Sequence, residues 1–255
     1  MFAITGITGR VGGEVARNLL AARQAVRGVV RGVGKGKAWA ESGCELVAAD
    51  TNDAAALTTA FEGVDGVFVL VPPNFDPSPD FQEARKIAAI LSRALDAARP
   101  GRVVYLSTIG AQAARSNLLS QHTIIEQALG NLSVPIAFLR PAWFMENSSW
   151  DVVPPKNGVI QSFLQPLDKP VPMVATADIG CLASELLQET WNGHRVVEIE
   201  GPHRVTPQGD RCQFRHSIGP SCESGTSAAR DLGIALPITR HEEPRASHSN
   251  ARRLQ

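Results

Sequence analysis

The first residues of the chain combine a short apolar segment, a glycine-rich turn and the start of an apolar pattern with helical period. Residues 2–4 are apolar, and Gly6, Gly9 and Gly12 follow as the helical pattern begins. A turn of this kind between a buried strand and a helix binds the pyrophosphate of a dinucleotide. The helix N-terminus offers unpaired N–H groups, and glycines let the backbone approach the phosphates. The alternative is an ordinary tight turn, which the order of strand, turn and helix makes the weaker interpretation.

Apolar segments alternate with helical patterns up to about residue 200. Strands are expected at 2–5, 25–30, 45–48, 66–71, 102–106, 136–139 and 196–199. Helices are expected at 11–22, 35–42, 53–61, 79–98, 117–129, 143–151 and 177–188. Strict alternation implies right-handed crossovers, so the predicted fold is α/β: a doubly wound, mostly parallel sheet of Rossmann type with a small irregular substrate region. The first strand should be central, with the strand order 3-2-1-4-5-6.

Composition and charge exclude several classes of protein. The chain has 25 basic and 25 acidic residues, so no basic surface for nucleic acid or for an anionic membrane is expected. No apolar run of about 18 residues suggests a membrane span, and no leader precedes the first strand, so a cytoplasmic protein is expected. The 4 cysteines show no CxxC spacing, so neither a disulfide framework nor a metal site is predicted.

The region 150–175 departs from the alternating pattern because prolines interrupt it repeatedly. It is expected to form an irregular loop over the carboxyl edge of the sheet, where doubly wound folds bind their ligands. We therefore expect one NAD(P)-binding domain over residues 1–207, with substrate-side elements from about residue 141.

The segment 208–255 has a different character from the rest of the chain. It contains no lysine and has poor hydrophobic periodicity. One interpretation is a disordered tail. The other, which we favour, is that the segment is translated out of frame, because back-translation with a shift of one nucleotide can restore two helical patterns.

Several segments distributed along residues 1–207 carry a family resemblance: Thr5-Gly-Ile-Thr-Gly-Arg-Val-Gly12, Val30-Arg31, Asp50, Val69-Leu-Val-Pro72, Leu106-Ser-Thr-Ile-Gly110 and Leu139-Arg-Pro-Ala-Trp-Phe-Met-Glu-Asn147. With them the chain resembles the NmrA-like group of atypical short-chain dehydrogenases/reductases, including members similar to type 2 NAD(P)H:quinone oxidoreductases. The resemblance implies a Rossmann fold that binds a nicotinamide dinucleotide, and a C-terminal part that helps to build the substrate pocket. It also implies an adenine contact at Asp50, whose alternative role is a cap before the third helix.

The end of the second predicted strand determines which dinucleotide fits. NAD-binding versions of this fold place an acid there to bond the ribose 2′-hydroxyl. Here the strand leads into Arg31, Lys35 and Lys37 follow, and the first acid is Glu41. A guanidinium pairs well with a 2′-phosphate, so NADP(H) is predicted in preference to NAD(H). The alternative, that these cations are solvated surface side chains, is stronger for the two lysines than for Arg31.

The expected cofactor contacts lie in the glycine turn and after the second to fifth strands: Gly6, Thr8, Gly9, Arg10, Val11, Gly12, Arg31, Lys37, Asp50, Val71, Pro72 and Ser107. Two interpretations of Arg10 stay open. It either lies over the pyrophosphate or covers the first turn of the helix.

The catalytic pair typical of the wider superfamily, a tyrosine followed four residues later by a lysine, is absent. The only tyrosine, Tyr105, lies in the fifth predicted strand and is interpreted as core, and Ile109 stands at the lysine position. The expected helix instead carries His122 and Glu126, whose spacing places them on one face. His122 is a candidate proton or hydrogen-bond donor near the nicotinamide, and Ser107 is a second catalytic candidate. The alternative for His122 and Glu126 is a pair of surface side chains.

Hydride transfer to a quinone requires fewer catalytic groups than carbonyl reduction does. The cofactor supplies the hydride, and the protein only stacks the acceptor and excludes water. Pro72, Phe144 and Met145 are expected to form an apolar cleft, and Asn147 to orient a quinone oxygen. The sequence therefore predicts an NADPH-dependent oxidoreductase that reduces a quinone or a similar small electrophilic acceptor. The alternative is a non-catalytic NADP(H)-binding redox sensor that acts through a protein partner.

Overall fold

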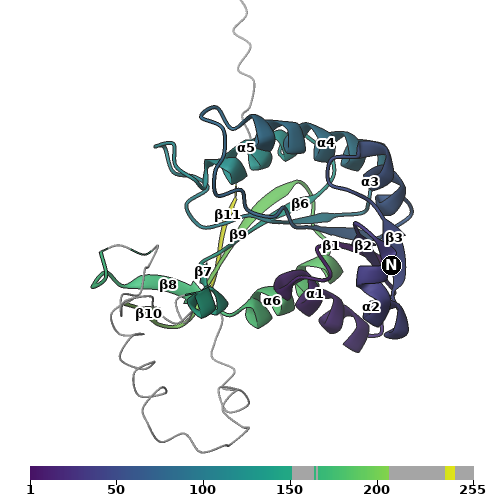
Figure 1. Ribbon diagram of the computed structural model, residues 1–255, viewed down its shortest axis with the longest axis horizontal. Coiled ribbons are helices and arrows are strands. Elements are labelled where there is room, and N and C mark those ends of the chain that lie inside the picture. The colour runs from purple at the N-terminus through teal and green to yellow at the C-terminus, as the bar shows by residue number, and fades with distance from the viewer. Residues whose placement is uncertain (151–163, 165, 207–238, 245–255) are drawn as a thin grey trace, which may run out of the picture.

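One large sheet forms the centre of the molecule (Figure 1). The computed structural model describes residues 1–150, 164, 166–206 and 239–244. The strands of the sheet are β1 (Phe2–Thr5), β2 (Val26–Val30), β3 (Glu45–Ala48), β4 (Gly66–Val69), β5 (Val103–Leu106), β6 (Ile136–Pro141), β9 (His194–Glu200) and β11 (Thr239–Pro244). Their order is β11-β9-β6-β5-β4-β1-β2-β3, and neighbours are parallel except β9 and β11. The predicted order with β1 central is therefore confirmed.

Helices cover both faces of this sheet, as a doubly wound fold requires (Figure 1). One face carries α1 (Arg10–Ala21), α2 (Lys37–Glu41) and α6 (Thr176–Gln188), and the other carries α3 (Ala54–Phe61), α4 (Gln82–Ala98) and α5 (Ser120–Leu129). The helix expected at 35–42 is divided into a 3-10 turn, η1 (Val33–Gly36), and the short α2. The α/β fold class is confirmed.

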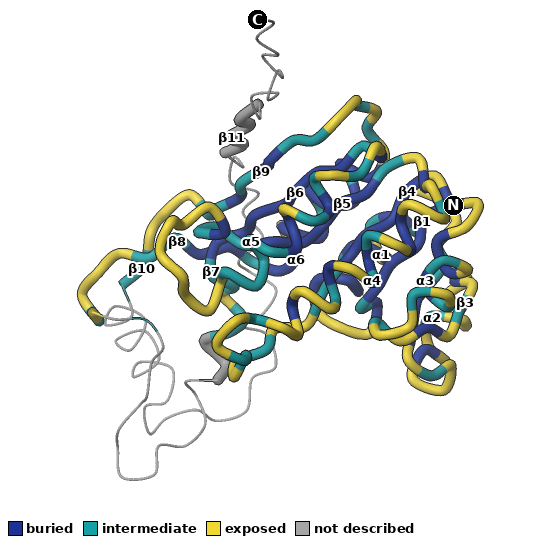
Figure 2. Tube along the Cα trace, turned by 90° about the horizontal axis from the view of Figure 1, so that it is seen from above, coloured by how far each residue is buried: buried dark blue, intermediate teal, exposed yellow. Residues whose placement is uncertain are grey.

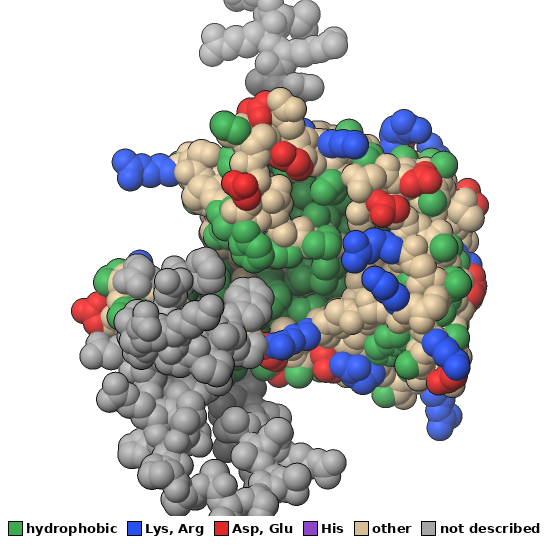
Figure 3. Space-filling model, viewed as in Figure 1, with side chains coloured by type: hydrophobic (Ala, Val, Ile, Leu, Met, Phe, Trp, Pro, Cys, Tyr) green, Lys and Arg blue, Asp and Glu red, His purple; other side chains and the backbone are tan. Residues whose placement is uncertain are grey.

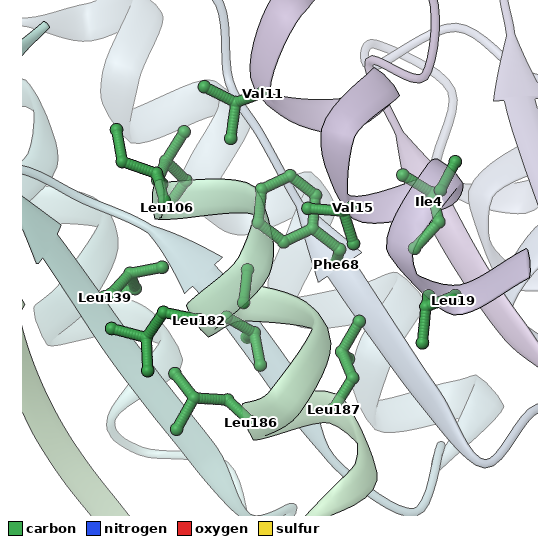
Figure 4. Packing of buried hydrophobic residues seen from close by; sticks show 14 of the residues in the cluster. Ile4, Val11, Val15, Leu19, Phe68, Leu106, Leu139, Leu182, Leu186 and Leu187 are labelled. Atoms are coloured by element: carbon green, nitrogen blue, oxygen red, sulfur yellow. The ribbon is translucent and has the colours of Figure 1, made fainter. Parts of the chain in front are cut away.

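Each face of the sheet has its own apolar core, because successive residues of a strand point to opposite sides. Ile4 and Phe68 belong to the core under α1 and α6, whereas Ala3 and Val67 belong to the core under α3, α4 and α5. Figure 4 shows the first core, where side chains of α1 and α6 meet those of β1 and β4. In Figure 2 the strands are mostly buried, and exposed residues follow the outer sides of the helices and the loops.

α1 and α6 approach each other closely at Gly180. A Cβ atom at this position would overlap the side chain of Glu14 and lie 3.1 Å from the backbone nitrogen of Val15. Only glycine leaves room for two helix backbones at this separation. The contact brings the first turn of α6 to the same side of the sheet as the first turn of α1.

A small second sheet lies beside the main one and has the order β10-β8-β7. It is formed by β7 (Trp143–Phe144), β8 (Val171–Val174) and β10 (Arg204–Val205). The helix predicted at 143–151 is wrong: after the two residues of β7 the chain forms a 3-10 helix, η2 (Met145–Trp150). Pairing with β8 and packing of Phe144 against the core outweigh the local helical pattern. The prediction of an irregular segment is likewise wrong for β8.

The first strand also determines where β4 ends. β4 stops at Val69 rather than at the predicted residue 71. The Thr5 hydroxyl, buried at the end of β1, accepts the backbone N–H of Leu70 at 2.7 Å. This side-chain bond occupies a backbone donor that a continued strand would use, so the chain leaves the sheet there.

The predicted atypical segment 208–255 lies outside the described residues except for β11. That strand pairs antiparallel with β9 along all six residues, from Thr239 opposite Glu200 to Pro244 opposite Arg195. Within the described part of the chain, no helix has both the length and the apolar character needed to cross a membrane.

Candidate functional site

The turn between β1 and α1 has the geometry of an anion-binding loop. Gly6 adopts a left-handed conformation with φ of 64°, and the N–H of Gly9 donates to the carbonyl of Gly6 at 2.8 Å. A Cβ atom on Gly12 would lie 2.6 Å from the Gly6 carbonyl carbon, so a side chain there cannot fit without moving the backbone. Glycines therefore allow both the sharp turn and the close approach of α1 to it.

The N-terminus of α1 is open for a negatively charged ligand. Gly9 is its N-cap, no side chain caps it, and its first turn carries no acidic residue. The first N–H groups of a helix have no partner inside the helix and carry a partial positive charge. An open hollow next to this turn is lined by Ile7, Thr8, Gly9, Arg17, Ala38, Trp39 and Ser42.

Arg31 and Asp50 follow the neighbouring strands β2 and β3 and lie within electrostatic reach of each other. The backbone N–H of Asn52, 2.8 Å from Asp50 Oδ1, contributes most to lowering the pKa of Asp50, followed by the Asn52 side-chain amide at 2.9 Å, and the positive charge of Arg31 lowers it further. The cap of α3 is Asp53, not Asp50: its Oδ1 accepts two backbone N–H groups of the first turn. Asp50 closes the turn before that cap.

Lys37 lies in α2 and not at the end of β2. Its side chain is 82% exposed, and its Nζ is 3.8 Å from the Glu41 carboxylate one helical turn on. This is the geometry expected of the alternative interpretation, a solvated surface cation. Arg31, by contrast, is exposed and has no such helix partner in the described residues.

Tyr105 and His122 form a contact between β5 and α5. Tyr105 is fully buried, as predicted for a core residue, and its hydroxyl oxygen is 2.8 Å from Nδ1 of His122. Burial and the negative charge of Glu126 raise the pKa of Tyr105 well above its ordinary value. Burial lowers the pKa of His122, while the charge of Glu126 acts in the opposite direction.

The second catalytic candidate, Ser107, belongs to a buried charged network. Its hydroxyl donates to Oε1 of Glu126 at 2.5 Å, and Arg140 binds the same carboxylate through Nε and Nη2 at 2.9 and 2.7 Å. Glu126 is 2% exposed and Arg140 is 8% exposed. The interpretation of Glu126 as a surface residue is therefore wrong: His122 lies half-buried, and Glu126 lies against the sheet.

Sequence reasoning missed Arg140 as part of the site. The residue does occur in the segment Leu139–Asn147 that carries the family resemblance, but a single sequence cannot show which carboxylate it pairs with. It also missed Glu146, whose carboxylate caps α6 by accepting the backbone N–H and hydroxyl of Thr176 at 2.9 and 2.6 Å. Burial, and then the charge of Glu146, raise the pKa of Asp178 in the same first turn.

The predicted substrate residues are held next to the glycine turn. Nη1 of Arg10 donates to the backbone carbonyl of Glu146 at 3.1 Å, which joins the start of α1 to η2. Phe144 packs against the core, Met145 is 49% exposed and Asn147 is half-buried. Figure 3 shows a hollow with an apolar floor between the two helical layers, with basic side chains on its rim.

The remaining predicted contacts surround the ends of the central strands. Val71 is half-buried and Pro72 is exposed just after β4, and Val11 is buried in the first turn of α1. Among the described residues, no cluster of His, Cys, Asp and Glu has the composition of a metal site.

Comparisons with known proteins agree with this geometry. A model of the NmrA-like family matches residues 1–206. A (4-alkanoyl-5-oxo-2,5-dihydrofuran-3-yl)methyl phosphate reductase of Streptomyces griseus is 31% identical over 92% of this chain and 81% of its own length. Quinone oxidoreductase 2 of Escherichia coli is 27% identical with the same coverages.

Solved structures are similar as well. The NADPH-dependent quinone oxidoreductase of Escherichia coli in complex with NADPH superposes with a TM-score of 0.71 at 25% identity, covering 86% of this chain and 76% of that one. The triphenylmethane reductase of Citrobacter sp. in complex with NADP(H) gives a TM-score of 0.70 at 22% identity with the same coverages, which supports the fold.

Proposed function

Because this chain belongs to the NmrA-like family, we propose that it is an NADPH-dependent reductase that transfers hydride to a quinone or a similar small electrophilic acceptor. The observation that carries the proposal is the β1–α1 turn, which joins an uncapped helix N-terminus to a glycine turn packed so closely that a Cβ atom on Gly12 would overlap the backbone of Gly6. Two relatives over most of the chain are a reductase and a quinone oxidoreductase, which favours an enzyme over a redox sensor.

The residues present fit a phosphorylated dinucleotide. Gly6, Gly9 and the first N–H groups of α1 would hold the pyrophosphate, and Arg31 would pair with the ribose 2′-phosphate. No acid stands at the end of β2 to favour the 2′-hydroxyl of NAD(H). When bound, the dinucleotide supplies the hydride.

The acceptor would lie in the hollow with the apolar floor (Figure 3), at the carboxyl edge of the sheet. Phe144 and Met145 offer apolar surface from one side, and Pro72 offers it from the loop after β4. An apolar site of this kind excludes water and stacks a planar acceptor. Asn147, half-buried in η2, would orient an acceptor oxygen.

His122 and Ser107 would serve the reacting end of the site. Both lie where β5 ends and α5 begins, which is where the wider superfamily places its catalytic groups. His122 would donate a hydrogen bond to the acceptor oxygen. Ser107, whose hydroxyl donates its hydrogen bond to Glu126, would accept a hydrogen bond from the cofactor.

The test is NADPH consumption with a benzoquinone and a naphthoquinone, measured together with a binding titration of NADPH and NADH. Turnover with a quinone and tighter binding of NADPH support the proposal. Tight NADPH binding without turnover of any quinone favours the redox sensor instead. Absence of binding to either dinucleotide contradicts both functions.

A further inference from the structure

The only tyrosine of the chain has a single hydrogen-bond partner among the described residues. Tyr105 is fully buried in β5, and its ring meets Phe138 edge-on at 6.4 Å. Its hydroxyl oxygen lies 2.8 Å from His122 Nδ1, and no other described acceptor or donor is in range. A buried phenol therefore meets an imidazole between β5 and α5, one helical turn from the buried carboxylate of Glu126.

The direction of this hydrogen bond follows from the rule that a buried proton donor needs an acceptor. If Nδ1 of His122 carried a proton and donated it, the phenol proton would remain buried without an acceptor. A buried donor without a partner costs about 1–3 kcal/mol. The phenol keeps its proton because burial and the charge of Glu126 raise the pKa of Tyr105. The hydroxyl of Tyr105 consequently donates, and Nδ1 of His122 accepts.

The acceptor role of Nδ1 determines the state of the whole ring. Burial lowers the pKa of His122, and the opposing carboxylate of Glu126 is itself engaged by Arg140 and by Ser107. A neutral imidazole has one ring proton, so in this ring it resides on Nε2. His122 is half-buried and no described residue binds Nε2, so this N–H is left for a ligand.

We infer that Tyr105 is a positioning residue that holds His122 in the Nε2–H form, so that a neutral imidazole presents one fixed hydrogen-bond donor to the acceptor oxygen. This inference rests on the proposed function for its substrate. The oxygen of a quinone gains negative charge as hydride arrives at the ring, and a donor already oriented toward it stabilises that charge without reorganisation. The ion pair of Glu126 with Arg140 fixes the next turn of the same helix to β6.

The tautomer is measured directly by nitrogen NMR of the full-length protein labelled in its histidine rings. In the wild type at neutral pH, the His122 signals should show a protonated Nε2 and an unprotonated Nδ1, with His122→Gln identifying them by their disappearance. In Tyr105→Phe the Nδ1–H form should become populated. The signals of His194 and His203, neither of which has a described contact with Tyr105, serve as the internal control.

Activity supplies the second readout. In folded Tyr105→Phe, kcat with a quinone should fall about tenfold with the KM for NADPH unchanged, because the donor is mispositioned while the cofactor site is intact. An unchanged kcat in the folded variant overturns the positioning role. A protonated Nδ1 in the wild type overturns the inference even if the protein is an active reductase. A protein that shows the Nε2–H form but reduces no quinone contradicts the proposed function instead. If Tyr105→Phe does not fold, the wild-type spectrum still decides.

Discussion

The guanidinium of Arg140 binds both oxygens of the Glu126 carboxylate, and the same carboxylate accepts a hydrogen bond from the hydroxyl of Ser107. The pair joins β6 to α5 immediately next to the end of β5. Because the Ser107 proton is directed at Glu126, the serine oxygen presents lone pairs, not a proton, to a ligand. Ser107, the second catalytic candidate, is therefore suited to accept a hydrogen bond.

Breaking this ion pair should strongly destabilise the fold. Arg140→Leu leaves the buried Glu126 carboxylate without its cation, and a buried charge without its partner costs about 3–5 kcal/mol. We expect the free energy of unfolding, measured in urea, to fall by that amount. The matched control is Lys37→Leu, which breaks the exposed pair with Glu41 and should change stability by less than about 1 kcal/mol. Equal effects of the two substitutions would show that the buried pair is not energetically special.

Arg31→Ala should separate the two dinucleotides. Losing one charge-assisted hydrogen bond should weaken NADPH binding by about 1.5–3 kcal/mol and leave NADH binding unchanged, because NADH lacks the 2′-phosphate. Isothermal titration with both cofactors measures the difference. Lys86→Ala, an identical charge change on the opposite helical layer, should alter neither affinity. Parallel losses for NADPH and NADH would mean that Arg31 does not contact the 2′-phosphate.

Gly9→Val should abolish binding of both cofactors and leave the fold largely intact. Gly9 is exposed and has an extended backbone, and an added Cβ would lie 3.2 Å from the Gly6 carbonyl oxygen, so the turn needs to shift by only a few tenths of an ångström. The valine side chain would still occupy the space that phosphates need. Near-identical melting temperatures together with lost binding are expected. Retained affinity would show that the turn is only a connector.

The pH dependence of stability should reveal the neutral state of His122. The pKa of His122 is lowered from 6.5 in the folded protein. Just below pH 6.5 its ring therefore binds a proton in the unfolded chain but stays neutral in the folded protein. His122 therefore lowers the free energy of unfolding as the pH falls through its pKa in the unfolded chain, and it has no such effect at higher pH. His122→Gln should lose less stability than the wild type between about pH 7 and pH 5.5. The difference in melting temperature between the two proteins at each pH measures this contribution of His122.

The arrangement of the strands could be predicted from the sequence because it depends on local patterns. The apolar strands, the glycine turn and the cap at Asp53 each act through residues close together in the chain. The helix predicted at 143–151 failed because Trp143 and Phe144 pair with β8, about thirty residues further on. The partnership of Arg140 with Glu126 was missed for a similar reason, since it exists only once β6 and α5 are packed together.

Arg10 connects the start of α1 to η2, and through Glu146 to the start of α6. Its guanidinium extends from the first residue of α1 to the carbonyl of Glu146, and the carboxylate of Glu146 in turn holds the first turn of α6. A substitution that shifts the backbone of η2 is therefore expected to shift the side chain of Arg10, which starts from the first turn of α1. If the proposed function holds, a redesign of η2 for a new acceptor should change dinucleotide affinity as well, so both should be measured in every variant.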